Sequence, residues 1–305
     1  MMDGEFLACD WGGTNLRAWR IGGDNKVLAA EDFALGVSRL SPGDAERRFR
    51  DEVRPALNAD HVPAILCGMI GSELGWRTAG YLDCPATLDA VARALVNVDS
   101  GSAPVWIVPG LKGPGPTSGA PEVMRGEETQ VLGWLGQDEA RGKGRRLFCH
   151  PGTHSKWVLA QDGAVERFVT CMTGELFDLL KTHSLLRSDS PATDDAAFDE
   201  GVTAAGDGGA LAARLFSVRA RVSAGVADPK STSSYLSGLL IGAEVASAPA
   251  LLGVGPRETI QLIGEPSLCD RYARAFASAG RPFHRHGGDE AAIAGLIALF
   301  RRLHA

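Results

Sequence analysis

Two short turns that contain glycine and threonine lie far apart in the chain, and each joins two mostly apolar segments. The first turn, DWGGT, lies between residues 5–9 and 17–21. The second, GTHS, lies between residues 146–151 and 156–160. Apolar runs interrupted by glycine predict β-hairpins. We therefore expect one hairpin in each half of the chain, with a basic residue after each turn.

Outside the hairpins, predicted strands alternate with predicted helices, which is typical of an α/β protein. The further predicted strands are residues 64–67, 105–108, 165–171 and 260–263. The predicted helices are residues 44–57, 88–98, 126–135, 174–186, 194–221, 233–248, 267–279 and 289–303. Residues 110–121 contain four glycines and three prolines. We expect this segment to form the crossing between two lobes or a loop beside a cleft.

Both turns have the composition of a phosphate site. Glycines such as Gly12, Gly13 and Gly152 allow backbone N–H groups to converge on an anion, and the hydroxyls of Thr14 and Thr153 add donors. The side chains expected to neutralise phosphate charge are Arg17, His154 and Lys156. Taken alone, each turn is more simply explained as an ordinary tight turn of a β-hairpin. The presence of two such turns, one in each half of the chain, favours a phosphate-binding cleft between them.

Asp10, directly before the first turn, is the candidate metal ligand. A carboxylate in this place can hold Mg²⁺ directly or through water, because Mg²⁺ prefers oxygen ligands. His284 and His286 are of metal-ligand type, but no cluster of further ligands accompanies them. We therefore predict Mg²⁺ at Asp10 and no zinc site.

Composition and motifs exclude several other classes of protein. The net charge of −6 without a basic block is unlike a nucleic-acid-binding protein. No apolar stretch reaches the ~18 residues of a membrane-spanning helix and no signal peptide is evident, so we expect a cytoplasmic protein that binds no membrane. The six cysteines form no CxxC pair, which indicates free thiols. The phosphate loop GxxxxGK[ST] and the dinucleotide motif GxGxxG are also missing from the sequence.

Five segments carry a family resemblance. They are DWGGTNLRAW at 10–19, GMIGSELGW at 68–76, MRGEETQ at 124–130, PGTHSKW at 151–157 and SYLSGLLIGAE at 234–244. In this order, and spread over most of the chain, they resemble the signature segments of the 2-keto-3-deoxygalactonate kinase (2-dehydro-3-deoxygalactonokinase) family. The resemblance implies a two-lobed actin-like ATPase (ribonuclease H-like) fold with ATP between the hairpins. It also implies phosphorylation of the 6-hydroxyl of 2-keto-3-deoxygalactonate by ATP in galactonate breakdown.

The resemblance also implies a division of the chain. With 305 residues, two cores of about 150 residues each are possible. We expect an N-terminal substrate and phosphate-hairpin lobe at 1–114 and a C-terminal nucleotide-binding lobe at 115–288. The helical segment 289–305 is expected to pack back on the first lobe. Residues 260–267 match the adenosine segment of the superfamily, although Gly264 is a single glycine where the common pattern has two.

Sugar kinases of this superfamily place a catalytic carboxylate at the start of a helix upstream of the second hairpin. In this sequence that position is occupied by Glu127 and Glu128. We predict Glu127 as the general base and keep Glu128 as the alternative, because consecutive helical side chains point about 100° apart. Two acidic residues at a helix start also have a purely structural explanation, because their negative charges interact favourably with the helix dipole. Glu175 and Asp178 are further candidates for the base. Related kinases have an aspartate at the position that a glutamate occupies here.

The substrate is expected beside the segment that follows the 64–67 strand, because loops at strand ends hold ligands in α/β sheets. The predicted substrate residues are Met69, Ser72, Trp76 and Arg125. A guanidinium suits a sugar-acid carboxylate, and Arg77 is the alternative to Arg125. Two other functions stay open: a kinase for another sugar or sugar acid, and a non-catalytic ATP-binding regulator on the same fold. The expected partner is a small sugar acid, and a homodimer is left open.

Overall fold

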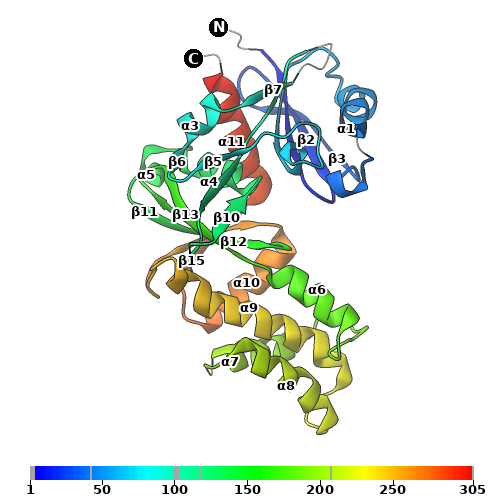
Figure 1. Cartoon of the computed structure of the whole chain (residues 1–305), viewed down its shortest axis with the longest axis vertical. Helices are drawn as coiled ribbons and strands as arrows, with labels where there is room; N and C mark the ends of the chain where they lie inside the picture. The colour runs from blue at the N-terminus through cyan, green and yellow to red at the C-terminus, as the bar shows by residue number, and fades with distance from the viewer. Residues whose placement is uncertain (1–3, 42, 99–102, 117–118, 207, 304–305) are drawn as a thin grey trace.

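The computed structural model describes residues 4–41, 43–98, 103–116, 119–206 and 208–303. Its first sheet has six strands and is built around the first predicted hairpin (Figure 1). In spatial order they are β3 (Val27–Phe33), β2 (Leu16–Ile21), β1 (Phe6–Trp11), β4 (Ala64–Gly68), β8 (Val105–Ile107) and β7 (Val96–Val98). Strand β1 runs antiparallel to β2 and parallel to β4, and all of its residues are buried. The turn after β1 is therefore fixed by a fully paired, buried strand.

The second six-stranded sheet repeats this arrangement around the second hairpin. In spatial order its strands are β15 (Phe283–Gly287), β14 (Ile260–Gly264), β11 (Arg145–His150), β12 (Ser155–Gln161), β13 (Ala164–Cys171) and β6 (Ala86–Thr87). Strand β11 runs antiparallel to β12 and parallel to β14, as β1 does to β2 and β4. Both predicted hairpins are confirmed. Strand β15 was not predicted: it is a short edge strand of partly exposed, polar residues that gives little apolar signal.

The glycine- and proline-rich segment 110–121 does not form the predicted loop. Strand β9 (Gly110–Pro114) pairs with β5 (Tyr81–Asp83) and with β10 (Pro121–Met124) in a separate three-stranded sheet. Leu111 and Met124 are buried and supply the apolar face that this sheet needs. Residues 117–118 of the predicted segment lie outside the described part of the chain.

Two predicted helices are shorter than expected. The helix predicted at 88–98 ends early, as α3 (Leu88–Arg93), because Val96 and Val98 pair with β8 instead. The helix predicted at 194–221 is divided into α7 (Asp195–Gly206) and α8 (Leu211–Ser223), with glycines between them. Residue 207 of that predicted helix lies outside the described residues.

The other predicted helices are confirmed within a few residues. They are α1 (Asp44–Arg48) with the π-helical turn η2 (Phe49–Val53) and α2 (Arg54–Ala56), α4 (Glu127–Leu135), α6 (Thr173–His183), α9 (Thr232–Leu251), α10 (Pro266–Ser278) and α11 (Gly288–Arg302). Helices α6 to α9 gather at one end of the molecule in Figure 1. In the part of the chain that the structure describes, every helix is too short or too polar to span a bilayer.

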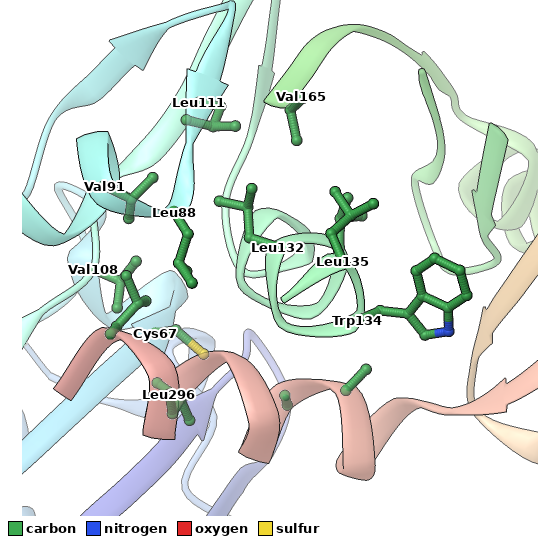
Figure 2. Packing of buried hydrophobic residues seen from close by; sticks show 14 of the residues in the cluster. Cys67, Leu88, Val91, Val108, Leu111, Leu132, Trp134, Leu135, Val165 and Leu296 are labelled. Carbon is green, nitrogen blue, oxygen red and sulfur yellow. The ribbon is translucent and has the colours of Figure 1, made fainter. Parts of the chain in front are cut away.

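Helices α4 and α11 pack against each other and against strands of both sheets. Figure 2 shows Leu132 of α4, Cys67 of β4 and Leu296 of α11 in one packed cluster. In the last turn of α11, the ring of Phe300 stacks on Phe6 of β1 with 3.9 Å between centroids. The two sheets therefore share one apolar core, to which α4 and α11 both contribute.

The contact between α4 and α11 depends on small residues. A Cβ atom at Gly295 would overlap the carbonyl oxygen of Thr129. We expect Gly295→Ala to destabilise the fold by about 1–3 kcal/mol, as overpacking does, and to lower the melting temperature by several degrees. Gly255→Ala is the matched control, because a Cβ there would meet no described atom within 4 Å. Equal melting temperatures for the two variants, measured by circular dichroism, would contradict this packing.

Candidate active site

Asp10 lies at the end of β1, beside the first turn. Its Oδ2 accepts a hydrogen bond of 2.8 Å from Nη2 of Arg17, and Arg17 also pairs with Asp289 at the start of α11. Burial raises the pKa of Asp10, and the adjacent Arg17 opposes this shift. The first hairpin therefore carries a carboxylate, Asp10, whose negative charge is partly balanced by Arg17 of the same hairpin.

Two glycines bring α4 against this carboxylate. Gly68 ends β4 with a φ of 88°, and a Cβ there would lie 2.7 Å from the carbonyl oxygen of Trp11 and 3.3 Å from Oδ1 of Asp10. Gly126 has a φ of 109°, and its Cβ would lie 3.3 Å from the Cα of Gly68. Side chains are strained in this backbone region and would separate the two segments. The start of α4 is thus held close to Asp10.

The adjacent Glu127 and Glu128 have different environments. Glu127 is a quarter exposed, with Oε1 3.8 Å from Nζ of Lys156 on the second hairpin. Glu128 is fully buried and accepts hydrogen bonds from the backbone N–H of Gly126 at 2.6 Å and the hydroxyl of Thr129 at 3.0 Å. Glu127 alone of this pair is therefore directed at the second hairpin.

Burial is the main influence on both carboxylates of this pair. It raises the pKa of Glu127, while the nearby Lys156 lowers it. For Glu128, burial and the charge of Glu127 raise the pKa to about 8. The burial of Glu128 and the two hydrogen bonds that it accepts suit a structural role for this residue.

The second turn is held by Lys156 and by the start of α6. Nζ of Lys156, a buried side chain, donates to the carbonyl oxygen of His154 at 3.3 Å. The ring of His154 pairs with Glu175, so Glu175 serves the turn and does not face Glu127. A Cβ at Gly174 would lie 2.5 Å from the carbonyl oxygen of Gly152. Helix α6 therefore presses directly on the second turn.

A pocket of about 260 Å³ opens beside the second turn. Gly152, Thr153, Thr173 and Gly174 form one wall, and Leu268, Arg271 and Tyr272 of α10 form another. Asp178 also lines this pocket. Gly264 precedes α10 and lies close to Pro151 of the turn. Sequence reasoning missed Thr173 and Gly174, although a Thr-Gly pair that follows a strand and opens a helix was a usable signal.

Arg125 lies just before α4, and its side chain packs against the segment after β4. Its Nη2 donates to the carbonyl oxygen of Gly80 at 2.8 Å, and its guanidinium lies 4.4 Å from the centroid of the Tyr81 ring. A Cβ at Gly71 would lie 2.7 Å from Nη1. Among the described residues, Nε and Nη1 of Arg125 and Oγ of the neighbouring Ser72 are buried without a hydrogen-bond partner. Polar atoms of this kind favour a polar ligand.

Met69 and Trp76 belong to the same segment, are partly buried and pack against the core of the first sheet. The Trp76 ring lies 5.5 Å from that of Phe49 between centroids. Trp76 and Arg77 line a different pocket, of about 370 Å³, with Glu46 and Asn97 among its other residues. Arg125 therefore lies against Gly71, the residue before Ser72, whereas Trp76 and Arg77 line a separate pocket.

A protein-family model described as 2-keto-3-deoxy-galactonokinase matches residues 10–299. The chain belongs to this kinase family. It is 37% identical over 301 residues to the 2-dehydro-3-deoxygalactonokinase of Escherichia coli K12, with 98% of each chain covered. A Sinorhizobium meliloti crystal structure, named for the same activity, has a TM-score of 0.86 and 36% identity over 97% of this chain and 98% of that one. The family predicted from the five segments is confirmed.

The fold expected for the family is also confirmed. The activator of the 2-hydroxyisocaproyl-CoA dehydratase from Clostridium difficile, solved with bound ADPNP, has a TM-score of 0.50 over 98% of this chain and 96% of that one. At 11% identity this likeness shows the fold alone, which is that of the actin-like ATPases. Membership of this kinase family implies that the chain uses ATP.

Proposed function

We propose that the protein transfers the γ-phosphoryl group of ATP to the 6-hydroxyl of 2-keto-3-deoxygalactonate. The observation that carries this proposal is the 3.8 Å approach between Glu127 and Lys156, which joins the start of α4 to the second hairpin. A carboxylate and an ammonium group so placed can serve a hydroxyl nucleophile and a phosphoryl group that lie side by side.

The triphosphate of ATP lies between the two turns in this proposal. Backbone N–H groups of Gly13 and Gly152 and the hydroxyls of Thr14 and Thr153 contact its oxygens. The N–H of Gly12 donates to the carbonyl oxygen of Asn15, so Gly12 shapes the first turn around the phosphates. The adenosine occupies the pocket of about 260 Å³ beside the second turn, which Leu268, Arg271 and Tyr272 of α10 line. Gly264, which lies close to Pro151 before that turn, is proposed to contact the nucleotide as well. The N-terminal lobe, residues 1–114, carries the sugar acid together with Arg125 of the second lobe. Residues 115–288 carry the adenosine and share the triphosphate with the first turn.

Mg²⁺ fits the carboxylate of Asp10 in this arrangement. In the described part of the chain, no group of three or more His, Cys, Asp or Glu residues could hold a metal by itself. Mg²⁺ in nucleotide sites is typically bound by one or two carboxylates, phosphate oxygens and water, so a single carboxylate is sufficient. When bound, the ion would neutralise phosphate charge. Arg17 balances Asp10 and restrains its orientation.

The remaining roles follow from the contacts at α4. Glu127 accepts the proton of the substrate hydroxyl as the phosphoryl group leaves ATP. Lys156 stabilises the negative charge on the transferred group, and its burial keeps water from weakening this interaction. Glu128 holds the first turn of α4 through Gly126 and does not contact substrate. His154 orders the second turn through Glu175.

The reaction is tested by coupled measurement of ADP release from ATP with 2-keto-3-deoxygalactonate, other 2-keto-3-deoxy acids and neutral sugars. We expect ADP release that requires the sugar acid and is fastest with 2-keto-3-deoxygalactonate. ³¹P NMR of the product should show a phosphate ester at the 6-position. Phosphorylation of a neutral sugar with equal kcat/KM would contradict the proposed substrate.

Arg125 and Ser72 are proposed to bind the sugar-acid carboxylate, since their buried atoms have no partner in the described structure. Replacing Arg125 with methionine removes a bidentate, charge-assisted contact. We expect KM for the sugar acid to rise by on the order of tenfold or more, because each 1.4 kcal/mol of lost binding is tenfold, with KM for ATP unchanged. Arg77→Met is the matched control. An unchanged KM for the acid in Arg125→Met would exclude this contact.

A further inference from the structure

Glu244 ends the SYLSGLLIGAE segment and has no part in the reaction proposed above. It lies on α9, and only 4% of its surface is exposed. Burying a carboxylate is costly unless hydrogen bonds satisfy its oxygens. Its partners therefore indicate which parts of the molecule it holds in place.

Both oxygens of Glu244 accept hydrogen bonds, one from Trp157 on the second hairpin and one from Tyr272, which lines the proposed nucleotide pocket. Nε1 of Trp157 donates to Oε1 at 2.7 Å, and the hydroxyl of Tyr272 donates to Oε2 at 2.8 Å. The Tyr272 oxygen also lies 2.8 Å from Oγ of Ser155. Because the Tyr272 hydroxyl donates its hydrogen bond to Glu244, its oxygen accepts the hydrogen bond from the hydroxyl of Ser155. One chain of hydrogen bonds therefore joins β12, α10 and α9.

This network restrains Lys156 from behind. Successive side chains of a strand point to opposite faces. Ser155 and Trp157 face Glu244, so Lys156 between them faces the other way, toward Glu127. Holding both neighbours of Lys156 fixes the backbone from which its side chain extends.

The same network supports the pocket beside the second turn. Tyr272 and Thr173 both line that pocket. The Thr173 hydroxyl is near enough to Glu244 to lower the pKa of this carboxyl, while burial raises it. Glu244 thus contacts two elements of the pocket wall as well as the strand that carries Lys156.

We propose that Glu244 is a positioning residue, which holds the second hairpin and α10 in the geometry that ATP requires. This inference rests on the nucleotide site proposed above. It assigns to α9 a role in the site although α9 itself contributes no reacting group.

Two replacements of Glu244 differ in the hydrogen bonds that they keep. In Glu244→Gln, the amide oxygen accepts from Trp157 and the amide N–H donates to Tyr272, whose own proton then turns to Ser155, so each of these groups keeps a partner. In Glu244→Leu, the donors of Trp157 and Tyr272 lose their acceptor. We expect the leucine variant to raise KM for ATP by on the order of tenfold and to lower kcat, since lost bonds to a buried charge have this size.

The glutamine variant is expected to stay within about threefold of wild type for ATP, because its bonds are retained. In both variants KM for the sugar acid should be unchanged. A melting temperature that falls in Glu244→Leu while KM for ATP and kcat stay at wild-type values would overturn the proposal and leave a purely structural role. Equal increases in both KM values would overturn it as well.

Trp157→Phe provides the test if the leucine variant does not fold, because it removes the N–H that donates to Glu244, and Trp157 does not line the nucleotide pocket. Calorimetry with ADP separates the two claims. A wild-type chain that binds ADP but does not phosphorylate the sugar acid contradicts the proposed substrate. Equal ADP affinity in wild type and Trp157→Phe overturns the positioning role of Glu244, whereas an affinity lowered severalfold supports it.

Discussion

Replacing Glu127 with glutamine is expected to lower kcat by on the order of 10²-fold or more, the usual contribution of a general base. The amide keeps the size of the side chain but cannot accept a proton from the substrate hydroxyl. ATP binding should survive, because Glu127 is assigned to the hydroxyl and not to the phosphates. Steady-state kinetics with the sugar acid and ATP varied in turn would measure both effects.

Glu128→Gln is the matched control for that variant. Its carboxyl is buried against Gly126 and Thr129, so its replacement should reduce stability more than kcat. A loss of kcat in Glu128→Gln as large as in Glu127→Gln, or larger, would contradict the assignment of the base.

The pH dependence provides a second readout for Glu127. A general base works only when deprotonated, so activity should fall as pH falls through its pKa. Burial raises that pKa above the ordinary 4.5, so the acidic limb should lie above the position expected for an exposed glutamate. The residual activity of Glu127→Gln should lack this limb.

Replacing Lys156 with methionine is expected to lower kcat/KM by about 10²- to 10³-fold, the cost of removing one preorganised stabilising group from a transition state. The effect should be large because Lys156 is buried and its charge is little screened by water. It should also move the acidic limb to higher pH, since Lys156 lowers the pKa of Glu127 and its loss lets that pKa rise.

Lys143→Met is the control for charge and residue type. Lys143 is an exposed side chain paired with Glu139, on α5 (Glu139–Gly142). We expect wild-type kinetics from it. An activity of Lys156→Met within about threefold of wild type would show that the group makes no interaction specific to the transition state.

The sequence was sufficient to predict the two hairpins, because glycine interrupts apolar alternation at both turns. It was insufficient where tertiary pairing overrides local preference. Residues 96–98 continue a helical pattern but complete the edge of the first sheet. Strand β15 is polar and partly exposed, so its pairing with β14 could be seen only in three dimensions.

The choice between Glu127 and Glu128 shows the same limit within the site. Their positions at a helix start were readable from the sequence, but their directions depend on the left-handed backbone of Gly126 and its contact with Gly68. The hydrogen bonds of Glu244 join residues up to 87 positions apart, and no sequence spacing indicates them. Such contacts belong to the folded chain and not to any local pattern.

The central claim is that both turns hold one triphosphate while Glu127 faces the sugar hydroxyl. A crystal structure with a non-hydrolysable ATP analogue and 2-keto-3-deoxygalactonate measures this directly. We expect phosphate oxygens within hydrogen-bond distance of the N–H groups of both turns, at Gly13–Thr14 and at Gly152–Thr153, and the 6-hydroxyl beside the Glu127 carboxylate. A triphosphate bound to one turn only, or a hydroxyl remote from Glu127, would contradict the account.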